Sequence, residues 1–172
     1  FELKSLDLDL NSIVIIDEAS MLSCHADTDP LLKFGSGNLF EDLITVLDID
    51  NTQRKIIFVG DVYQLPPINE NKSVALDPDR LNSYISKSIE TIVLSKVHRQ
   101  NTDSNVLKSA LLLSQQISSE NFLQIPIEAN QADIESVNLD QAIEKYMWSY
   151  QESSIFIAYT QQTVHKINQK FR

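Results

Sequence analysis

The segment IVIIDEASM, Ile13–Met21, decides the fold class of this chain, and the segment IIFVGDVYQLPPI, Ile56–Ile68, repeats its pattern. In each segment a run of apolar residues ends abruptly in polar residues. Continuous apolar runs of this kind are typical of strands covered on both faces of a parallel sheet. Open α/β sheets place nucleotide sites at the carboxyl ends of such strands. The two segments therefore predict an α/β fold with polar side chains at one edge of the sheet.

The other patterns predict helices and strands that alternate along the chain, which favours a mostly parallel sheet flanked by helices. Helical spacing of apolar residues and short apolar runs indicate these elements. The predicted helices are Leu39–Leu47, Val106–Ile117, Leu139–Tyr150 and Thr163–Phe171, and the further predicted strands are Thr91–Leu94 and Ile155–Tyr159. The segment Ser23–Asn38 is predicted to be a loop, and the polar segment Asn69–Ser83 is predicted to lie at the surface.

Composition limits the possible functions. A chain of 172 residues with 42% hydrophobic content can form one domain, or one domain and part of another. The net charge of −10 argues against a protein that binds nucleic acid over its whole surface, although a local binding groove stays possible. The single cysteine, Cys24, excludes an internal disulfide framework and predicts a reducing, cytoplasmic location. No apolar run approaches the roughly 18 residues of a membrane span, so no membrane partner is expected.

Asp17 and Glu18 follow the first predicted strand directly and, as neighbours, point in different directions. One carboxylate can hold Mg²⁺, which prefers oxygen ligands. The other can orient or deprotonate a water, and Ser20 can add a hydrogen bond. Taken alone, an Asp-Glu pair is more often a solvated acidic turn. The apolar run in front of it shifts the balance somewhat toward a site.

Gly60, Asp61 and Gln64 follow the second predicted strand. Glycine lets the backbone pass close to a neighbour or a ligand, and the Gln64 amide can contact a γ-phosphate without adding negative charge. Arg99 follows the third predicted strand, and its guanidinium can fork onto phosphate oxygens. The ordinary alternatives are a polar turn for Gln64 and a surface ion pair for Arg99.

Two further patterns argue against other kinds of site. The glycine-rich segment Phe34–Asn38 lacks the Gly-Lys-Ser/Thr ending of a phosphate-binding loop, and no such ending occurs in the sequence. Cys24 and His25 are adjacent, but no second pair of ligands follows at the spacing of a zinc motif.

Three motifs, in their order along the chain, resemble those of superfamily 1 DNA helicases of the RecD/TraA type. Asp17–Ser20 is similar to motif II, the Walker B element. Gly60–Ile68 is similar to motif III and is the most specific of the three. Val97–Gln100 is similar to motif IV, and Ile155–Asn168 resembles the opening of the second RecA-like domain. The resemblance covers most of the chain but only the middle of a family member.

The resemblance implies an incomplete RecA-like sheet divided between two domains. Residues 1–130 would be the C-terminal part of the first RecA-like ATPase domain, and residues 131–172 would begin the second. The phosphate-binding loop would precede Phe1 and the later motifs would follow Arg172. The chain would therefore be an internal fragment, and the fragment alone is expected to be inactive.

The resemblance also implies the cofactors, ATP and Mg²⁺, and a role for each site residue. Asp17 would hold Mg²⁺ and Glu18 would activate the hydrolytic water. Gln64 would contact the γ-phosphate and link hydrolysis to DNA movement, while Arg99 would stabilise transition-state charge from across the cleft. The full-length protein would translocate on single-stranded DNA and unwind partly duplex DNA, and an association with an exonuclease is one form this activity could take. The open alternatives are a non-catalytic, helicase-derived module that binds DNA or a protein, with the acidic balance favouring a protein, and a different P-loop ATPase.

Overall fold

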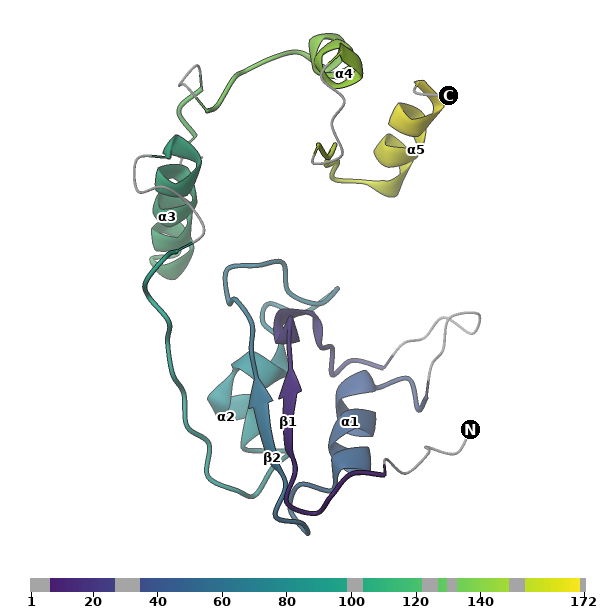
Figure 1. Cartoon of the computed structure of the whole chain (residues 1–172), viewed down its shortest axis with the longest axis vertical. Helices are drawn as coiled ribbons and strands as arrows, with labels where there is room; N and C mark the ends of the chain where they lie inside the picture. The colour runs from purple at the N-terminus through teal and green to yellow at the C-terminus, as the bar shows by residue number, and fades with distance from the viewer. Residues whose placement is uncertain are drawn as a thin grey trace. The chain divides into compact units, whose positions relative to one another are not determined.

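The computed structural model describes residues 7–26, 35–98, 104–121, 127–129, 133–148 and 154–170. The chain forms two compact units, residues 1–96 and 97–172. Their positions relative to each other are not determined (Figure 1). Together the described residues form a mixed α/β structure. The predicted domain boundary between residues 130 and 131 falls outside the described residues and stays a prediction.

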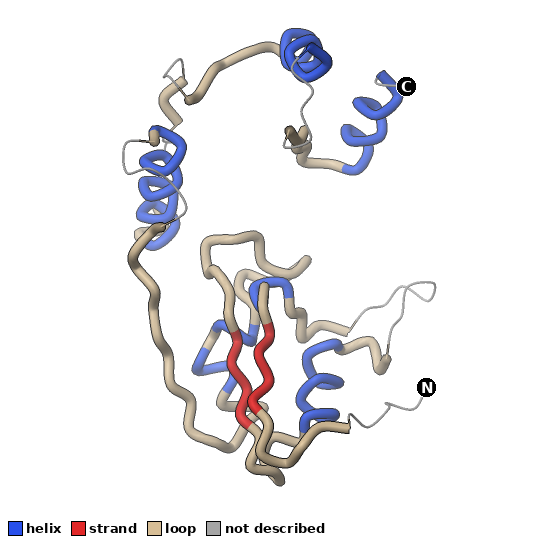
Figure 2. Tube along the Cα trace, in the orientation of Figure 1, coloured by secondary structure: helices blue, strands red, loops and turns tan. Residues whose placement is uncertain are grey.

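The first unit is built on two parallel strands, drawn red in Figure 2. Strand β1 is Ile13–Ile16 and strand β2 is Lys55–Phe58, in a register that pairs Ile13 with Lys55 and Ile16 with Phe58. The shorter elements and helices of this unit are the 3₁₀ turn η1 (Ala19–Met21), helix α1 (Leu39–Leu47), the 3₁₀ turn η2 (Val74–Leu76) and helix α2 (Pro78–Leu81). The prediction of a parallel arrangement is confirmed for these two strands.

The core of the first unit lies against one face of the sheet. Phe40 and Leu47, about two turns apart on the same face of α1, are completely buried. The Phe40 ring meets Phe58 of β2 at a centroid distance of 6.0 Å and Tyr84 at 5.1 Å. The same cluster also holds Ala19, Ile49, Val74, Ala75, Leu81 and Ile85. Helix α1 has the bounds that its apolar spacing predicts, because that spacing gives it one continuous face to bury.

The start of α1 is tied to the segment that follows β1. The Asn38 side chain accepts a hydrogen bond from the Glu41 amide at 3.1 Å and donates one to the Cys24 carbonyl at 2.9 Å. The first contact is an N-cap, which typically stabilises a helix by about 1 kcal/mol. The second fixes where the chain after β1 passes the helix.

The described residues of the first unit cover one face of the sheet. The side chains that pack against the core are Val14, Ile16, Ile56 and Phe58. On the other face, Ile13 is 60% exposed, Ile15 is 64% exposed and Ile57 is 47% exposed. The prediction that both faces are covered is therefore wrong for the described residues. Successive strand side chains alternate between faces, so a second layer would be needed to bury these three.

The polar segment Asn69–Ser83, predicted to lie at the surface, forms the second wall of the core instead. Its residues Ser73, Val74, Ala75 and Leu81 are all buried. The prediction failed because the apolar residues occur in short turns, η2 and α2, whose spacing fits neither a long helix nor a strand.

The two later predicted strands are not strands in the structure. In Thr91–Leu94, the side chains of Ile92, Val93 and Leu94 are 82–89% exposed. In Ile155–Tyr159, Ile155 and Ile157 are 80% and 82% exposed. A strand requires hydrogen bonds to a neighbouring strand, and no segment among the described residues supplies them. Both strand predictions are therefore wrong for this chain.

The second unit is helical in its described part. Its helices are α3 (Asn105–Ser118), α4 (Leu139–Trp148) and α5 (Gln161–Lys170). All three were predicted, although the predicted ends at Tyr150 and Phe171 fall outside the described residues. Ile143 of α4 and Ile167 of α5 are buried. No helix in the described parts of the chain is both long enough and apolar enough to cross a bilayer.

Candidate functional site

The turns that follow β1 and β2 lie side by side. The Val59 amide donates to the Ile16 carbonyl at 2.8 Å, and the Ala19 amide donates to the Val59 carbonyl at 2.8 Å. These two bonds continue the pairing of the strands beyond their carboxyl ends. The predicted meeting of the two polar segments at one edge of the sheet is therefore observed.

Gly60 allows these two turns to come this close. A Cβ atom at this position would lie 2.9 Å from Cδ1 of Leu76, 3.0 Å from the Ser20 nitrogen and 3.3 Å from the Ala19 nitrogen. Two of these three neighbours are backbone atoms, which cannot swing away as the end of a side chain can. The glycine is thus needed for close packing against the turn after β1.

Ser20 connects the first turn to Gln64. The Ser20 residue is only 3% exposed, and its hydroxyl donates to the Gln64 Oε1 atom across a long 3.4 Å contact. The backbone N–H of Gln64 donates to the Asp61 carbonyl at 3.2 Å, and this bond closes the second turn. The side chain of an exposed glutamine is thereby held next to the Asp17–Ser20 turn.

Asp17 and Glu18 are both exposed at the end of β1. The Asp17 Oδ1 atom accepts a hydrogen bond from the Glu18 amide at 2.9 Å. Glu18 adopts the left-handed conformation, with φ of 52° and ψ of 39°. For a residue with a side chain this conformation costs about 1–2 kcal/mol, and such strain concentrates at functional sites.

Asp61 is the third residue after β2, and its Oδ1 atom accepts a hydrogen bond from the Tyr63 amide at 2.9 Å. The edge therefore carries exposed carboxylates after both strands. Carboxylate oxygens are the ligands that Mg²⁺ prefers, so the donor set at this edge suits that ion. Asp17, Glu18 and Gln64 share this edge, whereas Arg99 falls outside the described residues.

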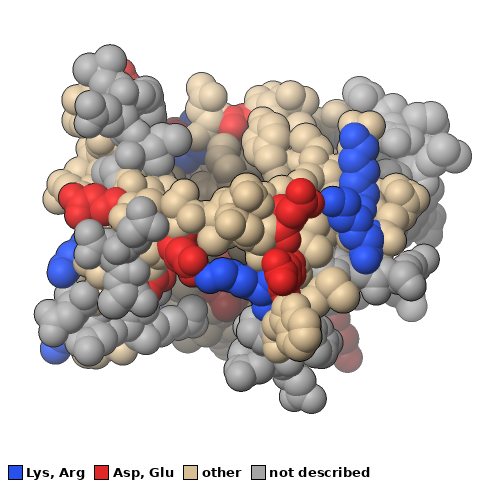
Figure 3. Space-filling view, turned by 90° about the horizontal axis from the view of Figure 1, so that it is seen from above, with Lys and Arg blue, Asp and Glu red and all other residues tan. Residues whose placement is uncertain are grey.

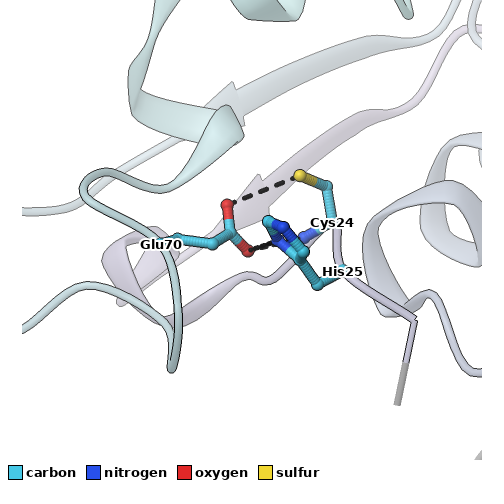
Figure 4. A group of neighbouring side chains, drawn as sticks. All are labelled: Cys24, His25 and Glu70. Carbon is cyan, nitrogen blue, oxygen red and sulfur yellow. Dashed lines mark hydrogen bonds and ion pairs between the residues drawn. The ribbon is translucent and has the colours of Figure 1, made fainter. Parts of the chain in front are cut away.

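A second group of polar side chains lies beyond the Pro66-Pro67 turn, centred on Glu70 (Figure 4). The Glu70 side chain is 0% exposed. Its Oε1 atom accepts from the Ser23 hydroxyl at 2.8 Å and from the Cys24 amide at 3.0 Å, and it lies 3.3 Å from Nδ1 of His25. Its Oε2 atom accepts from the Cys24 thiol at 3.4 Å and from Nη2 of Arg80 at 3.2 Å.

These contacts set the charge state of the group. Burial alone would raise the pKa of Glu70, but hydrogen bonds from Ser23, His25 and Cys24 outweigh it and lower the pKa to about 2. Burial raises the pKa of the Cys24 thiol, and the neighbouring Glu70 carboxylate raises it further. At neutral pH the group therefore holds an ionised carboxylate beside a protonated thiol.

Ser73 joins the same loop to the turn after β1. Its hydroxyl lies 2.8 Å from the Ala19 carbonyl and 2.7 Å from the Leu22 carbonyl, and the residue is 2% exposed. Glu70 and Ser73 together fasten the segment after β2 to the segment after β1. Sequence reasoning missed both residues, because a Glu and a Ser in a polar stretch carry no periodic or motif signal.

Charge is distributed without a broad basic area on the face shown in Figure 3. Lys and Arg side chains there form small separate groups beside Asp and Glu side chains. This agrees with the overall excess of 24 acidic over 14 basic residues.

No protein-family model, curated protein or solved structure matches the chain. The interpretation of the site therefore depends on the order of the motifs and on the geometry of the sheet edge.

Proposed function

We propose that this chain is part of an ATP-dependent DNA helicase of the superfamily 1 RecD/TraA type. In this proposal the edge formed by the Asp17–Ser20 turn and the Gly60–Gln64 turn is one side of an ATP site. The observation that supports it is the direct contact between the two turns, from the Ala19–Val59 hydrogen bond to the Ser20–Gln64 contact. Neighbouring parallel strands whose carboxyl ends carry polar turns are where open α/β sheets bind nucleotides.

Each residue at this edge has a role in the proposal. Asp17 holds Mg²⁺, and the ion supplies charge neutralisation on the phosphates when it is bound. Glu18 orients the attacking water and accepts its proton. Gln64 contacts the γ-phosphate, and its contact with Ser20 links that phosphate to the turn bearing Glu18. Arg99 supplies positive charge to the transition state.

The proposed activity belongs to a longer polypeptide, located in the cytoplasm, with DNA as its partner. The 172 residues contain no Gly-Lys-Ser/Thr sequence that could cradle the phosphates. Catalysis of phosphoryl transfer depends mainly on positioning and charge neutralisation. The purified 172-residue chain is therefore expected to hydrolyse little or no ATP, and robust turnover would contradict the proposal.

Glu18→Gln in the full-length protein is the sharpest test. The change keeps the shape of the side chain but removes the base, so hydrolysis should fall by about 10²–10⁴-fold while ATP binding is retained. DNA-stimulated ATPase rates and binding of a fluorescent ATP analogue measure the two effects separately. Glu41→Gln, at an exposed carboxylate in the first turn of α1, is the matched control and should leave both unchanged. Unchanged turnover in Glu18→Gln would refute the assigned base.

A non-catalytic binding module derived from a helicase is the second candidate. The open sheet face bearing Ile13, Ile15 and Ile57 and the net charge of −10 favour a protein partner over DNA for such a module. A full-length sequence without a Gly-Lys-Ser/Thr loop would favour this candidate. A different P-loop ATPase is a third, and the specificity of Gly60–Ile68 counts against it.

A further inference from the structure

Three side chains with metal-binding atoms converge beside α2. The ligand atoms of Cys24, His25 and Glu70 all lie within 4.8 Å of one another. Figure 4 shows the three side chains as neighbours. Cys24 and His25 come from the segment after β1, and Glu70 comes from the loop that follows β2. The chain therefore brings together two ligands that are adjacent in sequence and one that is 46 residues away from Cys24.

Two contacts within the cluster have the length of an edge of a tetrahedral zinc site. Zinc bonds of 2.0–2.3 Å imply ligand-to-ligand distances of about 3.3–3.7 Å. Glu70 Oε1 lies 3.3 Å from His25 Nδ1, and Glu70 Oε2 lies 3.4 Å from Cys24 Sγ. A thiolate, an imidazole and a carboxylate are also the ligand types that Zn²⁺ accepts. The two contacts are made by different oxygens of Glu70, so its carboxylate would present both oxygens to the same ion.

The charge around the cluster already has the arrangement that a cation requires. Nη2 of Arg80 donates to Cys24 Sγ at 2.8 Å and to Glu70 Oε2 at 3.2 Å, so a guanidinium now serves two of the three ligands. The Arg80 side chain is 39% exposed, and its Nη1 atom donates to the Lys72 carbonyl at 2.8 Å, a contact it can keep when Nη2 leaves the ligands. When Cys24 gives its thiol proton to water, Cys24 and Glu70 together carry two negative charges. These neutralise a divalent ion and release Arg80.

The cluster is also open to solvent on one side, because the His25 side chain is 60% exposed. An ion could enter there and complete its coordination with water. We propose that Cys24, His25 and Glu70 form a zinc-binding site, separate from the Asp17–Gln64 edge, in which Zn²⁺ displaces the Arg80 guanidinium. The bound ion would fasten the segment after β1 to the loop after β2. This inference does not depend on the proposed helicase function.

Titration of the purified 172-residue chain with Zn²⁺ alone, in competition with a chromophoric chelator, tests the proposal. We expect one ion per chain and a rise in the thermal unfolding temperature with added Zn²⁺. Cys24→Ser and His25→Gln should each weaken binding at least tenfold. Both alter partly or fully exposed residues, so circular dichroism can verify that the variants keep their fold. Glu70 is left unaltered in this test, because changing a buried carboxylate would also destabilise the fold.

His165→Gln is the matched control, because it removes a described exposed histidine that belongs to a different unit. It should bind Zn²⁺ as the unaltered chain does. Arg80→Gln should bind more tightly, since the competing cation is gone. The proposal is overturned if the chain binds no Zn²⁺, if His165→Gln weakens binding as much as His25→Gln, or if Cys24→Ser leaves the affinity unchanged. Weaker binding by Arg80→Gln would contradict the displacement step.

Discussion

Glu70 in the first unit and Asp133 in the second are both carboxylates that collect several hydrogen bonds, yet their surroundings differ. Glu70 has no exposed side-chain surface and joins three segments. Asp133 is exposed and joins its own segment to one helix. Asp133 accepts from the Ser104 hydroxyl at 3.0 Å and from the Asn105 and Val106 amides at 2.8 and 3.2 Å.

The pKa of each carboxyl is lowered to about 2, so the pKa alone does not distinguish them. At Glu70 the lowering has to overcome burial, which by itself would raise the pKa. At Asp133 the hydrogen bond from the Asn105 side chain is the largest cause. The comparison teaches that a similar pKa can accompany a carboxylate that organises a core and one that caps a helix in solvent. Burial decides how much the fold depends on each.

Removing the charge of Glu70 should have the largest effect. Glu70→Gln leaves Arg80 without its ionic partner and replaces an acceptor oxygen with an NH₂ group among donors, so we expect a loss of about 3 kcal/mol in the free energy of unfolding. Urea denaturation followed by circular dichroism measures it. Asp133→Asn is the matched change in the second unit and should cost much less. Equal losses from the two variants would break the comparison.

Ser73→Ala should have the next largest effect. The change removes a buried hydroxyl from two backbone carbonyls of the turn after β1, at a cost of about 1–2 kcal/mol. Ser104→Ala, which removes the N-cap of exposed helix α3, is the counterpart in the second unit. Hydrogen exchange resolved by peptide should show faster exchange near Ala19 in Ser73→Ala and only near α3 in Ser104→Ala. If Ser73→Ala exchanged faster only at the ends of η2, Ser73 would not be holding the turn after β1 in place.

The two units also share a strained conformation, which gives a smaller effect. Glu18 has φ of 52°, and Glu120, two residues after the end of α3, has φ of 53°. Glycine relieves this strain, so Glu18→Gly and Glu120→Gly should each raise the free energy of unfolding by about 0.5–1 kcal/mol. Thermal unfolding measures the gain, with Glu18→Ala as a control that should bring none.

Activity separates these two glycine variants. In the full-length protein Glu18→Gly should lose ATPase activity while Glu120→Gly keeps it, because only Glu18 is at the proposed site. If Glu18→Gly kept full activity, the assignment of Glu18 as the base would be refuted.

Acid should act weakly on Asp133. Because the folded pKa, about 2, lies below the ordinary value of 3.8, the stabilisation is complete above pH 3.8 and is lost as the pH falls toward 2. Amide exchange at the start of α3, near Val106, should rise over that range in the unaltered chain. In Asp133→Asn it should already be fast and should depend less on pH. An identical pH response in both would refute the capping role.

The sequence was sufficient for elements whose stability is local. Helix α1 follows from its apolar spacing, and the two strands and their polar ends follow from the runs beginning at Ile13 and Ile56. It was insufficient where a partner decides the outcome. Ile92–Leu94 has the composition of a strand but no described neighbour to pair with.

The candidate sites divide in the same way. The placement of Asp17, Glu18 and Gln64 at one edge of the sheet could be predicted, because each directly or closely follows an apolar run. Glu70 could not, because its importance comes from contacts with Cys24 and Arg80 that lie far from it along the chain or in another element. A solitary acidic residue in a polar stretch has the same local pattern whether it is buried or solvated.

The open sheet of the first unit has a practical consequence for solubility. Within the described residues β1 and β2 pair only with each other, so each strand has an outer row of unpaired backbone groups next to exposed apolar side chains. Such edges are templates for pairing with a second chain. Of the eight residues in the two strands, only Lys55 is charged and can discourage this. Aggregation through strand pairing, increasing with concentration, is therefore the expected hazard when these residues are expressed alone, and a second charged residue in place of Ile13 would counter it.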